Sequence, residues 1–121
     1  MRILVVDDDP VISKVFTVML QRADFEVDVA EDGLKGVEMW ENGNYDLVLM
    51  DVQMPRMNGF EATYTIREKE QARGGRIPIV AVTGYALEKD KEECLAAGMD
   101  TYMSKPIDFK KCIEMIHAII G

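Results

Sequence analysis

Short, strongly apolar segments alternate with longer stretches of helical periodicity along this chain, and this alternation restricts the fold more than any other feature. The apolar segments predict strands at residues 3–6, 25–29, 46–50, 78–82 and 99–103. Strands with nearly continuous apolar content are buried on both faces, as in a parallel sheet covered by helices. Right-handed crossovers between such strands give an α/β fold, a doubly wound (βα)5 three-layer sandwich around a five-stranded parallel sheet.

Helices are predicted between these strands, and local signals mark several of their ends. Asp9 before Pro10 is expected to cap the first helix, and Asp32 the second. Further helices are expected at residues 59–73 and 87–97. The fourth helix has few apolar anchors, chiefly Leu87, Cys94 and Leu95, and the last one carries Phe109, Cys112, Ile113, Ile116 and Ile120 on one face.

Length and charge limit the classes of function. A chain of 121 residues fits one domain, expected to span residues 1–121. The formal charge of -8 disfavours direct binding to nucleic acid or to anionic lipid. No apolar run is long enough for membrane insertion and no signal peptide is recognisable, so a cytoplasmic location is expected. Cys94, Cys112 and Trp40 are predicted to be core residues, with both thiols reduced, and the methionines to fill gaps in the core.

Polar side chains with useful chemistry follow the predicted strands. Asp7 and Asp8 follow the first strand, Asp51 ends the third, Thr83 ends the fourth, and Lys105 follows the fifth. In a doubly wound sheet, ligands bind outside the carboxyl ends of the strands, where the winding direction reverses. All of these side chains are therefore expected at the same edge of the sheet.

The chemistry of this set is that of phosphoryl transfer. Three clustered carboxylates repel one another unless a proton or a hard cation compensates them, and carboxylate and water oxygens suit Mg²⁺. A lysine and a threonine hydroxyl nearby would bind phosphoryl oxygens. A carboxylate nucleophile, a divalent metal, a cation and a hydroxyl together form a phosphoryl-transfer site.

Each residue also has a simpler explanation. Asp9 is better explained as a helix cap than as a ligand, and Asp51 alone is compatible with a turn that ends a strand. Thr83 also fits a helix cap, and Lys105 a solvated loop. His117, the one histidine of the chain, borders the apolar stripe of the last helix and has no expected acidic or metal partner, so it is expected on a helix face rather than as a phosphoacceptor.

Four motifs carry a resemblance to a known family. Val-Val-Asp-Asp-Asp-Pro at 5–10, Met-Asp-Val-Gln-Met-Pro at 50–55 with Asn58-Gly59, Ala-Val-Thr-Gly at 81–84 and Ser-Lys-Pro at 104–106 occur in order along the whole chain. The chain thus resembles the receiver domain of two-component response regulators. The resemblance implies a flavodoxin-like sheet with strand order 2-1-3-4-5.

The resemblance also implies roles for individual residues. Asp51 would be the phosphoacceptor, assisted by Lys105 and Thr83, and Asp8, Asp51 and the backbone carbonyl of Gln53 would bind the metal, with Asp7 acting through water. Thr83 and Tyr102 would form the switch, which alters the surface of the fourth helix, fifth strand and fifth helix. Gln53, Gly84 and Tyr85 would tune the lifetime of the phosphoryl group, and the Lys105–Pro106 peptide bond would be cis.

The function expected from this resemblance is a phosphorelay step that is not an enzymatic reaction on a separate substrate. A histidine kinase or a histidine phosphotransfer protein would donate to Asp51 with Mg²⁺ bound, Mn²⁺ being a substitute, and the domain would be a monomer or weak dimer. A stand-alone receiver and part of a hybrid histidine kinase or longer regulator both fit. Two other classes stay open: an aspartyl-phosphate hydrolase, disfavoured by Gln53 in the place of a second acid, and a pseudo-receiver that never takes phosphate.

Overall fold

The computed structural model describes residues 1–52, 54, 57–84 and 88–120, and its centre is a five-stranded sheet. Each pairing between neighbouring strands in the described part of the chain is parallel, and the strand order is β2-β1-β3-β4-β5. The doubly wound α/β fold and the strand order expected from the sequence are thereby confirmed. The strands are β1 (Arg2–Val6), β2 (Glu26–Ala30), β3 (Leu47–Asp51), β4 (Ile79–Thr83) and β5 (Thr101–Ser104).

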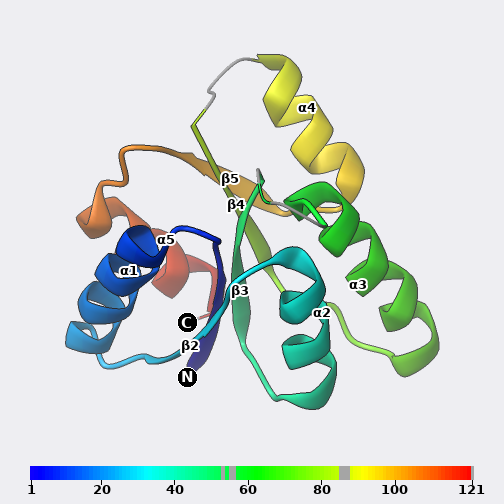
Figure 1. Cartoon of the computed structure of the whole chain (residues 1–121), viewed down its shortest axis with the longest axis horizontal. Helices are drawn as coiled ribbons and strands as arrows, with labels where there is room; N and C mark the ends of the chain where they lie inside the picture. Colours follow the sequence, from blue (N-terminus) through cyan, green and yellow to red (C-terminus); the bar gives the residue numbers. More distant parts are fainter. Residues whose placement is uncertain (53, 55–56, 85–87, 121) are drawn as a thin grey trace.

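Helices cover both faces of the sheet, because successive side chains of each strand point to opposite sides. On β1, Ile3 and Val5 pack against one layer of helices, whereas Leu4 and Val6 pack against the other. Figure 1 shows α1 and α5 on one side of the sheet and α2 and α3 on the other, with α4 at the upper end. The helices are α1 (Pro10–Arg22), α2 (Gly33–Asn42), α3 (Gly59–Arg73), α4 (Glu88–Ala97) and α5 (Phe109–Ile120).

The predicted caps are present. The side chain of Asp9 accepts hydrogen bonds from the backbone of Val11 and Ile12 at the start of α1, and Asp32 accepts one from Lys35 at the start of α2. Trp40, Cys94 and Cys112 are buried, as predicted, and neither cysteine forms a disulfide bond within the described part of the chain.

Four strands, β2 to β5, begin later than predicted, and for β5 and β2 the reason is that residues before the strand still hydrogen-bond to the preceding helix. The backbone N–H of Met99 donates to the carbonyl of Cys94, which closes α4 around Gly98, so β5 begins at Thr101 rather than at residue 99. Phe25 likewise donates to Leu20 of α1, and β2 begins at residue 26.

The C-terminal ends of β3 and β4 also differ from their predicted bounds. Pairing of β3 with β4 includes Asp51 and Val82, and pairing of β4 with β5 includes Thr83 and Ser104. Asp51 and Thr83 are therefore the last residues of their strands, as expected, although each strand extends one residue beyond its predicted bound. Their backbones are held by the sheet ladder, which fixes the positions of both side chains.

Leu95 was wrongly predicted to anchor α4. Cys94 is 1% exposed and Ala97 is 3% exposed, whereas Leu95 is 57% exposed. The spacing of Cys94 and Ala97 sets which side of the helix faces the core, and Leu95 lies outside that side. The other predicted anchor, Leu87, lies outside the described residues.

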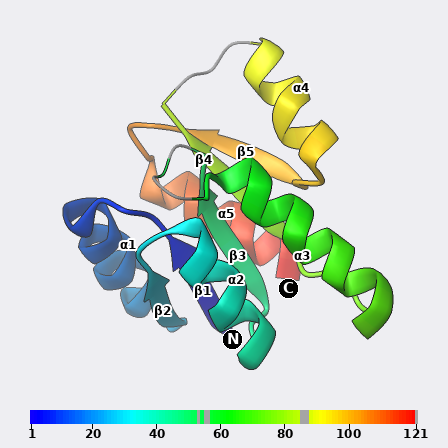
Figure 2. The ribbon, with the colours of Figure 1, turned by 45° about the vertical axis from the view of Figure 1, so that its right-hand side comes forward.

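The N-terminus and α4 lie at opposite ends of the sheet in both views (Figures 1 and 2). Among the described residues, no helix has the length and apolar character needed to cross a lipid bilayer.

Candidate functional site

Three carboxylates meet at the carboxyl edge of the sheet, where β1 and β3 end side by side. One carboxylate oxygen from each of Asp7, Asp8 and Asp51 lies within 4.8 Å of the others. Asp7 is 3% exposed and Asp51 is 5% exposed, whereas Asp8 is exposed. The cluster therefore has a buried inner part and one side open to solvent.

Lys105 approaches the same cluster from β5. Its Nζ atom lies 3.7 Å from Oδ2 of Asp51 and 4.0 Å from Oδ2 of Asp7. The backbone N–H of Lys105 donates to the carbonyl of Thr83 at 2.7 Å, and the peptide bond between Lys105 and Pro106 is cis. The structure thus brings the lysine to the carboxylates, rather than leaving it in a solvated loop.

Burial and the groups around Asp7 have opposing effects on the pKa of its carboxyl, and burial has the largest effect. Burial raises the pKa of its carboxyl above the ordinary value of 3.8, and the neighbouring charges of Asp8 and Asp9 add to the rise. The hydrogen bond from the backbone of Asp9, at 2.9 Å, and the ammonium of Lys105 lower the pKa but do not cancel the effect of burial. Keeping Asp7 ionised in this place therefore costs free energy, which a bound cation would offset.

The start of α3 is held close to Asp51. Asn58 caps α3 and forms a capping box with Glu61, and the backbone of Gly59 donates to the carbonyl of Val52. A Cβ atom at residue 59 would collide with the carbonyl oxygen of Asp51. Only glycine lets this helix begin directly against the end of the strand.

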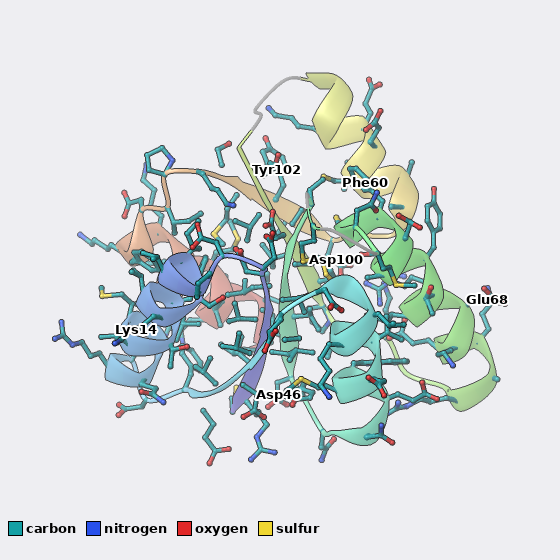
Figure 3. The ribbon with its side chains drawn as sticks, viewed as in Figure 1. Lys14, Asp46, Phe60, Glu68, Asp100 and Tyr102 are labelled. Carbon is teal, nitrogen blue, oxygen red and sulfur yellow. The ribbon has the colours of Figure 1, made fainter. Side chains whose placement is uncertain are left out.

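Thr83 and Tyr102 lie on the neighbouring strands. Thr83 is 4% exposed at the end of β4. Tyr102 is partly buried and belongs to the core layer on the side of α2, α3 and α4. Figure 3 places Tyr102 at the upper end of the sheet, on the side where α4 lies.

Of the remaining predicted residues, the structure describes Gly84 and His117 but not Gln53 and Tyr85. Gly84 is exposed, and a Cβ atom built on it would meet nothing within 4 Å. Gln53 and Tyr85 lie outside the described residues, so the structure gives no position for the predicted metal-binding carbonyl. His117 is exposed on α5 and its ring lies 5.2 Å from that of Phe25, as expected for a residue on a helix face.

Two residues of the site were missed by the sequence analysis. Ser13 is buried in α1, and its hydroxyl donates to the backbone carbonyl of Asp7 at 3.3 Å. Asp9 was assigned only as a cap, yet its backbone N–H also donates to the Asp7 carboxylate. Ser13 lies one helical turn after Asp9, and this spacing was the signal from which its position near the site could have been predicted.

The donor set fits a hard divalent cation. All the converging ligand atoms are carboxylate oxygens, and one of the three residues is open to solvent, as suits an ion that keeps several waters. Lys105 stands beside the carboxylates, where it can bind an anion that approaches Asp51.

Comparison with known proteins identifies the family. The model of the response regulator receiver domain matches residues 3–117. The chain is a response regulator receiver domain.

Receiver domains of several kinds resemble this one. It is 39% identical over 124 residues to hybrid signal transduction histidine kinase I of Dictyostelium discoideum, a match over 98% of this chain. The receiver domain of a sensor histidine kinase from Pseudomonas aeruginosa PAO1, with a magnesium ion coordinated in its active-site cleft, is 38% identical, with a TM-score of 0.89 over 99% of this chain and 97% of that one.

The receiver domain of Saccharomyces cerevisiae Ssk1, solved in complex with the histidine phosphotransfer protein Ypd1, is 26% identical. Its TM-score is 0.95 over 99% of this chain and 88% of that one. The receiver domain described here spans only 7% of the length of the Dictyostelium kinase. The family assignment therefore concerns a signalling module, and not the activity of a whole kinase.

Proposed function

We propose that this receiver domain accepts a phosphoryl group on Asp51 from a phosphohistidine of a histidine kinase or a histidine phosphotransfer protein. The observation that carries the proposal is the juxtaposition of Asp51 with two further carboxylates and with the ammonium group of Lys105, 3.7 Å from Oδ2 of Asp51. A nucleophile, a place for a cation and a fixed positive charge are the parts that phosphoryl transfer requires.

In the transfer, a carboxylate oxygen of Asp51 forms a bond to phosphorus while the phosphorus–nitrogen bond of the donor breaks, and the imidazole leaves with the electron pair. Lys105 binds a phosphoryl oxygen and balances its charge, and the hydroxyl of Thr83 donates to another. Asp8, Asp51 and the carbonyl of Gln53 would hold Mg²⁺ or Mn²⁺, with Asp7 acting through water. The bound ion would neutralise charge on the transferred group.

An apolar groove beside the site supports a protein as the donor. The groove is lined by Val11, Ile12, Val15 and Phe16 of α1 and by Pro106 and Ile107, with Lys105 also at its wall. Val11 is 69% exposed and Val15 is 43% exposed. Because exposed apolar surface of this kind is typical of protein contacts, we place the donor protein against α1, with its phosphohistidine directed at Asp51.

Phosphorylation would act on partners through a switch. The phosphoryl group draws the hydroxyl of Thr83 toward Asp51, and Tyr102 turns into the space that Thr83 leaves. The surface of α4, β5 and α5 changes as a result. The domain is proposed to act in the cytoplasm as one unit over residues 1–121, as a monomer or weak dimer, and not as an enzyme on a separate substrate.

Residues next to the site would set how long the phosphoryl group lasts. Gly84 leaves open space beside Thr83, which suits the approach of a bulky donor. Gln53 and Tyr85 are proposed to control access of the attacking water.

Incubation with acetyl phosphate and Mg²⁺, followed by mass spectrometry, tests the proposal. We expect one phosphoryl adduct on the wild type and none on Asp51→Asn. Absence of any adduct on the wild type would indicate a pseudo-receiver. Rapid turnover of unrelated phosphate esters would indicate a hydrolase.

A further inference from the structure

Lys91 of α4 lies against the ring of Tyr102. Its Nζ atom is 5.1 Å from the ring centroid, within the range in which an ammonium is attracted to the face of an aromatic ring. Both side chains are partly buried. The contact joins a residue of α4 directly to the proposed switch residue of β5.

Tyr102 reaches this position because of the register of β5. Met103 packs in the core layer of α1 and α5, so its neighbour Tyr102 points to the opposite face of the sheet, toward α4. Lys91 lies one turn before the buried Cys94, and residues three apart share a side of a helix. The lysine therefore projects from the side of α4 that faces the sheet.

The C-terminal end of α4 is held firmly, which keeps Lys91 near Tyr102. Nε of Arg67, on α3, donates to the carbonyl of Gly98 at 2.9 Å. The same guanidinium binds Glu70 at 2.7 Å and Asp100 at 2.9 Å. Asp100 also accepts from the backbone of Ile79 on β4, so α3, β4 and the turn after α4 form one connected unit.

We propose that Lys91 is the positioning residue that biases this switch toward its resting state. The inference rests on the proposed function, in which Tyr102 turns toward the space beside Thr83. That turn carries the ring away from α4 and breaks its contact with the ammonium group. Lys91 therefore stabilises the resting pose of Tyr102 and opposes the phosphorylated state, and it makes the position of α4 depend on the pose of the ring.

Linkage gives the expected direction of the effect. A ligand binds more tightly to a protein whose competent state is more populated. Loss of a partly exposed cation–π contact should raise the population of the pose in which Tyr102 is turned toward Thr83. The affinity for beryllium fluoride, which takes the place of the phosphoryl group at Asp51 in this test, should then rise by roughly two- to fivefold. Because Lys91→Met also removes a positive charge, a purely electrostatic effect would weaken binding of this anion instead.

The experiment is an NMR titration with beryllium fluoride and Mg²⁺, followed on the backbone amides of β4. Lys91→Met should tighten binding, and Lys91→Arg, which keeps a cation over the ring, should bind like the wild type. Lys69→Gln is the matched control, since it removes a positive charge from the exposed ion pair between Lys69 of α3 and Glu41 of α2. In a Tyr102→Leu background, Lys91→Met should no longer tighten binding.

Each other outcome has a distinct meaning. Equal or weaker binding by Lys91→Met overturns the inference, and so does tightening that persists with Tyr102→Leu. If the wild type itself does not bind beryllium fluoride, the proposed function fails and the inference fails with it. A wild type that binds, with an affinity insensitive to Lys91, leaves the proposed function standing and removes only the role of Lys91.

Discussion

The backbone N–H of Lys105 donates a 2.7 Å hydrogen bond to the carbonyl oxygen of Thr83, which extends the pairing of β4 and β5 by one residue beyond Ser104. The bond holds the proposed hydroxyl donor and the proposed ammonium at a fixed spacing on neighbouring strands. Asp51 stands on the next strand along, where it pairs with Val82 of β4. Three of the groups proposed to contact the phosphoryl group are thus held by one ladder of hydrogen bonds.

Replacement of Lys105 tests its role as the fixed positive charge. Lys105→Met should slow phosphorylation of Asp51 by acetyl phosphate by about a hundredfold, as expected for loss of one preorganised charge-stabilising group. The rate is measured by mass spectrometry over time. Lys110→Met, on the exposed surface of α5, is the control and should react like the wild type. Equal rates for the two variants would exclude a role for Lys105 in the transfer.

Asp7 gives a pH-dependent prediction. Its pKa is raised in the folded state, mainly by burial, so the folded protein binds this proton more tightly than the unfolded chain does. Stability is therefore lost as the pH rises from 3.8 through the folded-state pKa, and the cost is full above it. Asp7→Asn should unfold at higher urea concentration than the wild type near neutral pH in the absence of divalent ions.

This gain should shrink as the pH falls toward 3.8. Urea unfolding followed by circular dichroism at a series of pH values measures it. Asp24→Asn is the matched control, because Asp24 is exposed and asparagine tolerates its positive φ of 69°. A gain for Asp7→Asn that is the same at every pH would contradict the account.

Magnesium should stabilise the fold through the acidic cluster. A ligand that binds only the folded state adds about 2.7 kcal/mol at one hundred times its dissociation constant. The melting temperature of the wild type should therefore rise with Mg²⁺, and the rise should be much smaller in Asp8→Asn. Glu31→Gln is the control, since Glu31 lines the groove beside Asp7 and Asp8 without belonging to the cluster. A loss of equal size in both variants would point to a nonspecific charge effect.

The apolar groove on α1 should matter for phosphoryl transfer from a protein donor but not from a small-molecule donor. Val15→Asp should reduce phosphoryl transfer from a phosphorylated histidine phosphotransfer protein by about tenfold, the cost of one well-placed interface residue. Its reaction with acetyl phosphate should not change. Val18→Asp is the matched control on the same helix, because Val18 is 39% exposed and is not among the residues that line the groove. A decrease with both donors would mean that the substitution disturbs the site rather than docking.

Local signals explain why much of the fold was predictable. The Asp9–Pro10 pair marks the start of α1 through contacts within one helical turn, and the apolar runs around Val5 and Leu49 leave little choice of environment. Asp51, Thr83 and Lys105 were placed at one edge because the carboxyl ends of parallel strands always share an edge. The four motifs then supplied the roles, which stay predictions.

The rest depended on contacts between residues distant in the chain. Acidic and basic residues occupy most positions of α4, so the spacing of its few apolar residues did not reveal that Leu95 faces outward. The network of Arg67 with Gly98 and Asp100 joins residues more than thirty positions apart, and no spacing rule indicates it. The contact of Lys91 with Tyr102 likewise requires the packing of α4 on the sheet.

The central claim is tested most directly with a donor that carries a radiolabelled phosphohistidine. The donor is mixed with the wild type and with Asp51→Asn in the presence of Mg²⁺, and the labelled residue is located by peptide mapping. We expect the label to leave the donor and to reside on Asp51 of the wild type, while Asp51→Asn takes none. Label that stays on the donor, or that reaches the Asp51→Asn variant to the same extent, would contradict the account.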